Sequence, residues 1–276
     1  MSCSSGLILA TRHFSESPRQ LRLFWLSIVS GWCLLGKSVF AQPSFQHAYY
    51  IVHNDTLPYR LYVPDTLPAK PLPLLIFLHG AGSRGMDNER HLTHFRQAAA
   101  HIARYYPCVM LAPQCPKDKR WVEVDWQLRS HQMPAEPSHP LAMSMQLLDS
   151  LLSVLPIDTN RLYITGLSMG GYGTWDWIQR QPWRFAAAAP ICGGADTRNA
   201  PQLKHLPIWI FHGALDAVVP VSRSRDMYHA LIEAGNRQVR YTEYPDVYHD
   251  SWKRAYASPE LWQWLFSQAK NATAKH

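Results

Sequence analysis

The sequence has little charge and little cysteine. Charged residues make up 17% of its 276 residues, and cysteine occurs only 5 times. Disordered chains combine high charge with few apolar residues, whereas 47% of this chain is hydrophobic, so the bulk of it is expected to fold. The chain also lacks internal repeats and low-complexity tracts. Its length suits one large α/β domain better than a string of small modules.

A dense basic patch is lacking as well. The formal net charge is +7, but the lysines and arginines are scattered, and no short window is basic enough to follow a phosphate backbone. We therefore expect no nucleic-acid partner.

An apolar run near the start of the chain predicts a secretory signal peptide. The run from Leu21 to Leu35 follows basic residues and leads to Val39, Phe40 and Ala41, a small-x-small cleavage pattern. We predict a signal peptide over residues 1–41, cleaved after Ala41, and a single α/β domain over 42–276. An uncleaved anchor is the alternative, but the run is short for a bilayer span. The mature protein is expected to be secreted or periplasmic, without stable membrane association.

The remaining cysteines do not form a disulfide framework. Only Cys108, Cys115 and Cys192 follow the predicted cleavage site, an odd number without CxxC spacing. Cys108 and Cys115 bracket one apolar run, which in extended form would hold them more than about 20 Å apart. We expect buried free thiols. Lipid attachment at Cys33 is disfavoured by the bulky Trp32 before it.

The hydrophobic pattern predicts a doubly wound, mostly parallel α/β sheet with an N-terminal antiparallel hairpin. The hairpin is expected from aromatic and β-branched runs at 49–52 and 59–63. Six continuous apolar runs predict strands buried on both faces, at 72–78, 108–112, 161–165, 185–191, 207–211 and 239–244. Apolar spacing of three and four predicts helices over 89–104, 141–155, 170–181, 222–234 and 259–269. In such a sheet the ligand site lies at the carboxyl ends of the strands.

One segment, 116–140, lacks a convincing period and is rich in proline. It follows a predicted strand, so we expect a long loop beside the ligand site. Trp121 and Trp126 either contact substrate there or hold the loop down. We assign Trp121 as the substrate-binding residue.

A nucleophile elbow is the strongest motif. The strand at 161–165 runs into Gly166, Leu167, Ser168, Met169 and Gly170, and a predicted helix follows. The G-x-S-x-G turn is so tight that side chains flanking the serine would collide, and it lifts the Ser168 hydroxyl above the sheet. Ser168 is the predicted nucleophile.

A serine nucleophile needs a histidine base and an acid that orients it. After an elbow they should follow in the order acid, then histidine, each just past a later strand. Asp216 follows the strand at 207–211, and His249 follows the strand at 239–244. They are the predicted acid and base, with Asp246 and Asp250 as rival acids.

The oxyanion hole should combine two backbone N–H groups, one after the nucleophile and one from the loop after the 72–78 strand. The first is Met169. The second lies in His79, Gly80, Ala81 and Gly82, where we choose Ala81, with Gly82 as the near alternative and a further substrate-binding residue.

With these motifs the chain resembles the α/β-hydrolase superfamily. More narrowly, it is similar to a branch of secreted esterases and predicted peptidases related to polyhydroxybutyrate-depolymerase and feruloyl-esterase-like proteins. The resemblance spans about Tyr49 to Gln268 and rests on LIFLHGAGSRGMDN (75–88), VMLAPQCP (109–116), YITGLSMGGYGTWD (163–176), PICGGAD (190–196), WIFHGALDAVVP (209–220) and YPDVYHDSW (244–252). One departure is Ser83, where related sequences often carry an acidic residue. This departure lies in the specificity loop and leaves the predicted triad unchanged.

The triad and the resemblance predict a secreted serine hydrolase that cleaves carboxylic esters through an acyl-enzyme, with a small-molecule or saccharide ester as substrate. A serine peptidase of the same fold is the first alternative. A lactonase similar to dienelactone hydrolase is less favoured, since such enzymes have cysteine where this chain has Ser168. A non-catalytic polymer-binding protein is disfavoured by the intact triad. The short segment 193–206 leaves no room for a large helical lid.

No cofactor and no metal are expected. His91 and His94 are three residues apart in a predicted helix, a spacing that suits a metal pair, but no third ligand is in register. We interpret them as an exposed helix face.

Overall fold

One nine-stranded sheet forms the centre of the molecule. The computed structural model describes residues 7–8, 42–65 and 70–270, and the strands lie in the order β1-β2-β3-β5-β4-β6-β7-β8-β9. Apart from Leu7–Ile8, which forms β1, the predicted signal peptide lies outside the described residues. The other strands are Gln46–Val52 (β2), Asp55–Tyr62 (β3), Leu72–Leu78 (β4), Val109–Pro113 (β5), Ile157–Leu167 (β6), Ala187–Ile191 (β7), Ile208–Gly213 (β8) and Val239–Tyr244 (β9).

The central strands are parallel, and the N-terminal ones are antiparallel. Strands β4 to β9 pair in parallel, whereas β2 pairs with β3, and β3 with β5, in antiparallel register. Every residue of β4, β5 and β7 is buried, as expected for strands covered on both faces. The predicted fold class, including the N-terminal hairpin, is confirmed.

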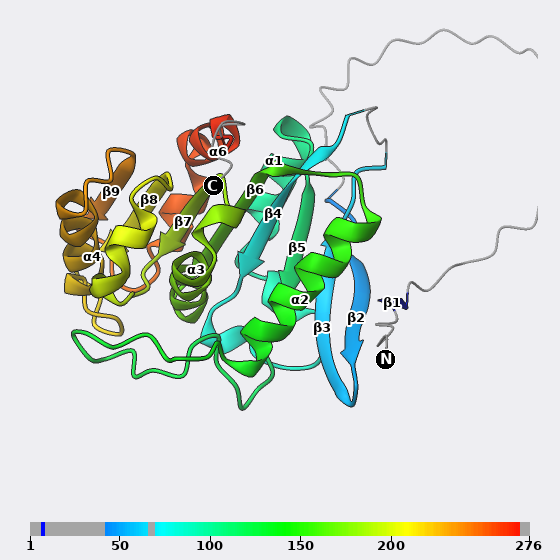
Figure 1. Cartoon of the computed structure of the whole chain (residues 1–276), viewed down its shortest axis with the longest axis horizontal. Coiled ribbons are helices and arrows are strands. Elements are labelled where there is room, and N and C mark those ends of the chain that lie inside the picture. Colours follow the sequence, from blue (N-terminus) through cyan, green and yellow to red (C-terminus); the bar gives the residue numbers. More distant parts are fainter. Residues whose placement is uncertain (1–6, 9–41, 66–69, 271–276) are drawn as a thin grey trace, which may run out of the picture.

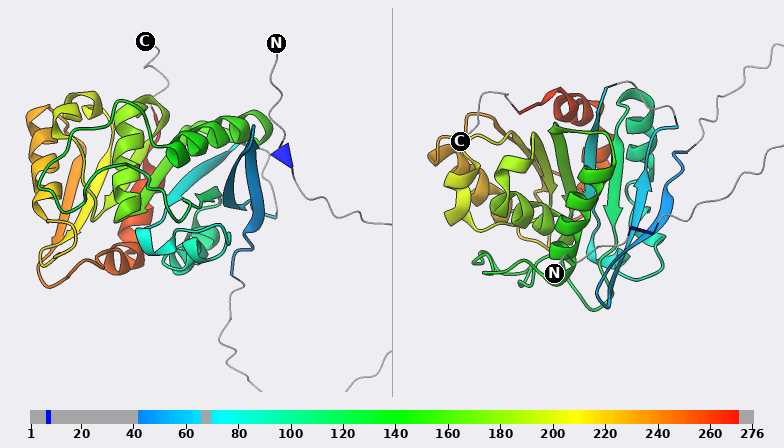
Figure 2. Two further views of the ribbon diagram at one scale, coloured as in Figure 1. Left: turned by 90° about the horizontal axis from the view of Figure 1, so that it is seen from below. Right: turned by 45° about the vertical axis from the view of Figure 1, so that its right-hand side comes forward.

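Helices cover both faces of the sheet (Figures 1 and 2). Helices His139–Val154 (α2), Met169–Arg180 (α3) and Ser222–Glu233 (α4) pack on one face, where their apolar residues form one core cluster. Helices Arg96–Tyr105 (α1), Trp252–Ala257 (α5) and Pro259–Ser267 (α6) supply the cluster on the other face. Only the short 3-10 helix Thr197–Leu203 (η4) lies between β7 and β8.

The helix predicted over 89–104 begins later than expected. Residues Arg90–Leu92 form a 3-10 turn (η2), and α1 starts at Arg96. The interpretation of His91 as exposed is wrong. Its side chain is buried, and its Nε2 lies 3.0 Å from the carbonyl oxygen of Ala112 at the end of β5. This tertiary contact outweighs the local helical pattern.

The loop 114–138 connects β5 to α2. In Figure 1 it runs along the lower side of the molecule, beneath α3 and towards α4. It is held by side chains from α3: Arg180 donates to the carbonyl oxygens of Pro134 and Ala135, and the Tyr172 hydroxyl donates to that of Trp126. The loop therefore leaves the carboxyl end of β5 and runs along α3 from Tyr172 to Arg180.

The prediction that Trp121 contacts substrate is wrong. Its side chain is 0% exposed, and its indole Nε1 donates to the carbonyl oxygen of His79 at 3.0 Å. It packs against α3, where a Cβ on Gly173 would lie 2.7 Å from the Cβ of Trp121. Trp121 thus anchors the loop to β4 and α3, because its large apolar surface and its N–H are both satisfied in the core.

We predict that Trp121→Ala lowers the free energy of unfolding by about 3–5 kcal/mol, the usual result of deleting a buried tryptophan. Trp183→Ala is the matched control, because Trp183 is 67% exposed, and it should change stability by less than about 0.5 kcal/mol. Urea unfolding followed by circular dichroism measures both values. Similar small losses in the two variants would contradict the anchoring role.

Candidate active site

Ser168 lies in a strained turn between β6 and α3. Its backbone has φ 55° and ψ −119°, a conformation that costs energy for any residue with a side chain. The flanking glycines are required by close backbone approach: a Cβ on Gly166 would collide with the Gly170 backbone, and one on Gly170 would collide with the Leu78 carbonyl. The sequence thus folds into the expected elbow, with the Ser168 hydroxyl at the carboxyl edge of the sheet.

The three residues of the predicted triad lie in a row. The Nε2 atom of His249 lies 2.8 Å from Ser168 Oγ, and its Nδ1 lies 2.7 Å from Asp216 Oδ2. With Nδ1–H donating to the carboxylate, Nε2 is free to accept the serine proton. These residues are far apart in the sequence, and the ends of β6, β8 and β9 bring them together.

The rival acids are engaged elsewhere. Asp246 forms a bidentate pair with Arg254 at 2.7 and 2.6 Å, and Asp250 pairs with Lys253 at 2.7 Å. In the structure neither carboxylate accepts a hydrogen bond from His249, whose Nδ1 is directed at Asp216. The geometry therefore favours Asp216 as the acid.

The Asp216 carboxylate accepts four hydrogen bonds. Its Oδ1 accepts from the backbone N–H groups of Val218 and Val219 at 2.8 and 2.9 Å, and its Oδ2 accepts from His249 Nδ1 and from His212 Nε2, the latter at 3.1 Å. Burial alone would raise the pKa of Asp216, but the hydrogen bonds from the two histidines and from the Val219 N–H hold it well below its usual value. Asp216 is therefore ionised and fixed in orientation at neutral pH.

His212 is a site residue that the sequence analysis did not assign. It is fully buried at the end of β8, and its Nδ1 lies 2.7 Å from the Ser224 hydroxyl. Because Nε2 faces two acceptors, Asp216 Oδ2 and the Val219 carbonyl oxygen, it carries the proton, and Nδ1 accepts from Ser224. Its position four residues before Asp216 was a signal, but nothing in the sequence shows that both side chains turn inward.

The predicted oxyanion-hole residues flank Ser168. Ala81 begins the 3-10 helix Ala81–Ser83 (η1) and Met169 begins α3, so neither N–H has an acceptor within its own helix. The η1 loop passes beside the nucleophile, because a Cβ on Gly80 would lie 3.6 Å from the Cβ of Ser168. Gly82 is exposed, and a Cβ there would meet nothing within 4 Å. Gly82 therefore faces open space, where a substrate has room.

His79 holds the η1 loop in place through hydrogen bonds at both of its ring nitrogens. Its Nε2 accepts from the Cys115 N–H at 2.9 Å, so its Nδ1 carries the proton and donates to the Gly80 carbonyl oxygen at 2.7 Å. The Trp121 indole N–H donates to the backbone carbonyl oxygen of His79. Burial lowers the pKa of His79 to about 4. The neutral imidazole ties the loop to the end of β5.

The described cysteines are free and buried, as expected. Cys192 lies beside the triad, and its sulfur and the ligand atoms of Asp216 and His249 all lie within 4.8 Å of one another. Such a group resembles a metal site. However, burial raises the pKa of the Cys192 thiol well above its usual value, and His249 Nδ1 and Asp216 Oδ2 already bind each other. A protonated thiol is a poor ligand, so these residues fit a proton relay better than a metal.

The parallel sheet, the strained elbow serine and the Ser168–His249–Asp216 row define the α/β-hydrolase class. The chain belongs to the phospholipase/carboxylesterase family, whose sequence model matches residues 67–258. It therefore has the α/β-hydrolase fold of that family.

Individual relatives agree with this class. The chain is 29% identical over 148 residues to a poly(3-hydroxyoctanoate) depolymerase of Pseudomonas fluorescens, covering 49% of this chain and 51% of the depolymerase. It is 26% identical over 209 residues to a bifunctional acetylxylan esterase/xylanase of Neocallimastix patriciarum, covering 68% of this chain and 26% of that enzyme. The chain thus spans about half the length of one relative and a quarter of the other.

Solved structures share the fold. A thermostable esterase superposes with a TM-score of 0.73 and 40% sequence identity, covering 82% of this chain and 63% of the esterase. A ferulic acid esterase superposes with a TM-score of 0.61 at 16% identity, covering 82% and 99%, which reflects the fold alone. Within the described residues, no helix has the length and apolar character needed to cross a bilayer.

We predict that stability falls when the pH drops below about 6.5. Burial lowers the pKa of His79 to about 4 and that of His91 to about 3, so the unfolded chain, with values of about 6.5, takes up protons first. Stability is therefore complete above pH 6.5 and is lost progressively as the pH falls towards these folded-state values.

Between pH 6.5 and pH 5 the two residues together should cost about 3 kcal/mol. Urea unfolding at a series of pH values measures the drop. His91→Gln, which keeps an N–H donor but does not titrate, should reduce it, whereas His205→Gln at an exposed position should not. A free energy of unfolding that is constant between pH 7 and pH 5 would contradict the assignment of these histidines as neutral.

Proposed function

We propose that this chain cleaves carboxylic esters through an acyl-enzyme, with Ser168 as nucleophile, His249 as general base and Asp216 as the orienting acid. The observation that carries the proposal is the unbroken row of contacts from Ser168 Oγ through His249 to Asp216, at 2.8 and 2.7 Å. Serine alone is a weak nucleophile at neutral pH, and such a row is the arrangement that activates it.

The geometry supports the following sequence of steps. Ser168 Oγ attacks the ester carbonyl carbon while His249 Nε2 takes the hydroxyl proton, and Asp216 stabilises the imidazolium. The N–H groups of Met169 and Ala81 donate to the oxyanion. His249 then returns its proton to the leaving alcohol oxygen as the carbon–oxygen bond breaks, which leaves the acyl group on Ser168. A water deprotonated by His249 attacks the acyl carbon. The bond between that carbon and Ser168 Oγ then breaks, His249 returns the proton to Oγ, and the acid leaves.

The proposed substrates are small-molecule or saccharide esters, including hydroxycinnamoyl esters. Support comes from the relatives, whose names refer to a polyester and to acetylated xylan. We also propose that residues 1–41 act as a signal peptide, so that the enzyme works outside the cytoplasm. A peptide substrate is the alternative outcome, and assaying amides beside esters distinguishes the two.

We predict that Ser168→Ala and His249→Ala each abolish nearly all ester turnover and that the double variant loses little more, because the residues act as one unit. Rates on p-nitrophenyl acetate and on acetylated and feruloylated saccharides measure the effect, with circular dichroism as the folding control. Labelling by a fluorophosphonate should disappear in Ser168→Ala. Multiplicative losses, or labelling that persists in Ser168→Ala, would refute the triad.

A second prediction concerns His212. A hydrogen bond to a charged group contributes about 1.5–3 kcal/mol, so His212→Phe, which cannot donate to Asp216, should lower kcat about 10- to 100-fold. KM should change little, since His212 is buried and does not reach the substrate. Ser224→Ala, which removes only the outer partner of His212, should have a smaller effect. A folded His212→Phe variant with normal kcat would show that the other three hydrogen bonds suffice for Asp216.

A further inference from the structure

A buried arginine with an uncompensated charge lies near the proposed triad. Arg223 is in the first turn of α4, and its side chain is 2% exposed. Its Nε and Nη1 atoms are buried and have no hydrogen-bond partner, and no salt bridge within residues 42–65 and 70–270 involves it. A buried guanidinium without an anion is costly, so its presence requires an explanation.

The groups around Arg223 do not neutralise it. Its Nη2 donates to Nδ1 of His131, and burial together with Arg223 lowers the pKa of His131 to about 4, so this imidazole is neutral at pH 7. The guanidinium also lies 5.4 Å from the ring centroid of Tyr172. A cation–π contact offsets part of the desolvation cost but supplies no negative charge.

The buried acids at this edge of the sheet are already paired. Asp196 accepts from Arg198 and from the Met133 N–H, and Asp216 is saturated by its four donors. Rearrangement of either carboxylate towards Arg223 would break those hydrogen bonds. Among the described residues no carboxylate forms a salt bridge with Arg223, so a ligand anion would supply the missing negative charge.

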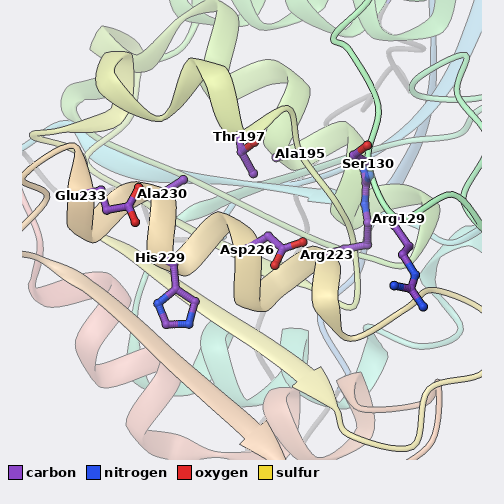
Figure 3. Close-up of a pocket in the computed structure, with 9 residues that line it drawn as sticks. All are labelled: Arg129, Ser130, Ala195, Thr197, Arg223, Asp226, His229, Ala230 and Glu233. Carbon is purple, nitrogen blue, oxygen red and sulfur yellow. The ribbon is translucent and has the colours of Figure 1, made fainter.

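A pocket adjoins the guanidinium. It has a volume of about 340 Å³ and lies between α4, the start of η4 and the loop 129–130 (Figure 3). Besides Arg223 it is lined by Arg129, Ser130 and Thr197, which add a second cation and two hydroxyl donors, and by the exposed acids Asp226 and Glu233 of α4. Gly194 leaves room for the guanidinium, because a Cβ there would collide with Arg223 Nε.

This pocket is on the same side of the sheet as the nucleophile. Tyr172, over which Arg223 lies, is one helical turn after Ser168, and its N–H donates to the Ser168 carbonyl oxygen at 3.0 Å. Ser224, the neighbour of Arg223, contacts His212, which in turn contacts Asp216. Arg223 is thus linked to Ser168 through Tyr172 and to Asp216 through Ser224 and His212.

We propose that Arg223 binds a carboxylate carried by the substrate, so that the preferred esters are those of molecules with a second, free acid group. The inference rests on the proposed function and adds the substrate class. Guanidinium pairs with carboxylate through charge-assisted hydrogen bonds, which are the strong ones in a site shielded from water. Arg129 and Ser130 line the pocket, and a carboxylate that enters it would replace the contact between His131 and Arg223 Nη2.

The test compares matched anionic and neutral esters. The p-nitrophenyl monoester of adipate is compared with p-nitrophenyl hexanoate, and acetoxybutyrate with butyl acetate, so that the carboxylate is placed on either side of the scissile bond. In at least one pair we expect the wild type to prefer the anionic ester in kcat/KM. Arg223→Met should lower that preference by about 10- to 100-fold and leave the rate on the neutral ester nearly unchanged. Arg223→Lys should retain part of it.

The control variants distinguish binding of a carboxylate at Arg223 from a general effect of the protein's charge. Arg237→Met removes an exposed arginine elsewhere and should leave the preference unchanged, whereas Asp226→Asn removes a negative charge from the pocket and should increase it. An anionic-to-neutral ratio that is equal in the wild type and in Arg223→Met, for both pairs, overturns the proposal.

Failure of the proposed function gives a different result. If no ester is turned over, calorimetry with adipate itself decides the matter, because it needs no catalysis. Binding to the wild type that is lost in Arg223→Met supports the carboxylate site. Absence of binding, or equal binding to both proteins, overturns it. Thermal unfolding of each variant shows that the comparison is made between folded proteins.

Discussion

The buried carboxylate of Asp216 is the group on which the site depends. A charge removed from water is tolerated only when donors replace the lost solvation, and here two backbone N–H groups and two histidines do so. Those four donors also fix the direction of the carboxylate. Its orientation sets the tautomer of His249, and that tautomer leaves Nε2 able to accept the Ser168 proton. The proposed reactivity of Ser168 therefore depends on the fixed orientation of Asp216.

The surroundings of Ser168 are likewise held in place by packing and hydrogen bonds. Ser168 is held in an unfavourable backbone conformation because β6 and α3 are both packed into the core and the close backbone approaches at Gly166 and Gly170 leave no other path. On the opposite side, the neutral His79 and the buried Trp121 tie the η1 loop to β4 and β5. The N–H groups proposed as oxyanion donors are thus held by packed segments, which is what preorganised stabilisation of a developing charge requires.

The buried charge of Arg223, in contrast, has no salt-bridge partner among the described residues. Asp216, Asp196 and His79 each have their hydrogen bonds completed within the protein, whereas the Nε and Nη1 atoms of Arg223 do not. A bound ligand or ion is one way in which such a group is completed. A carboxylate site beside Tyr172, the residue one helical turn after Ser168, would make the free acid group of a substrate a determinant of specificity.

The sequence by itself determined the fold class, the strand–helix alternation and the elbow, because these depend on local periodicity and on glycines in a fixed spacing. It also located Asp216 and His249, since the order of strands fixes which loops meet at the sheet edge. Only the tertiary structure decided where individual side chains point. Trp121 and His91 are buried and His212 faces Asp216, because long-range packing chooses the inward face of a loop or short turn, and no local pattern records that choice.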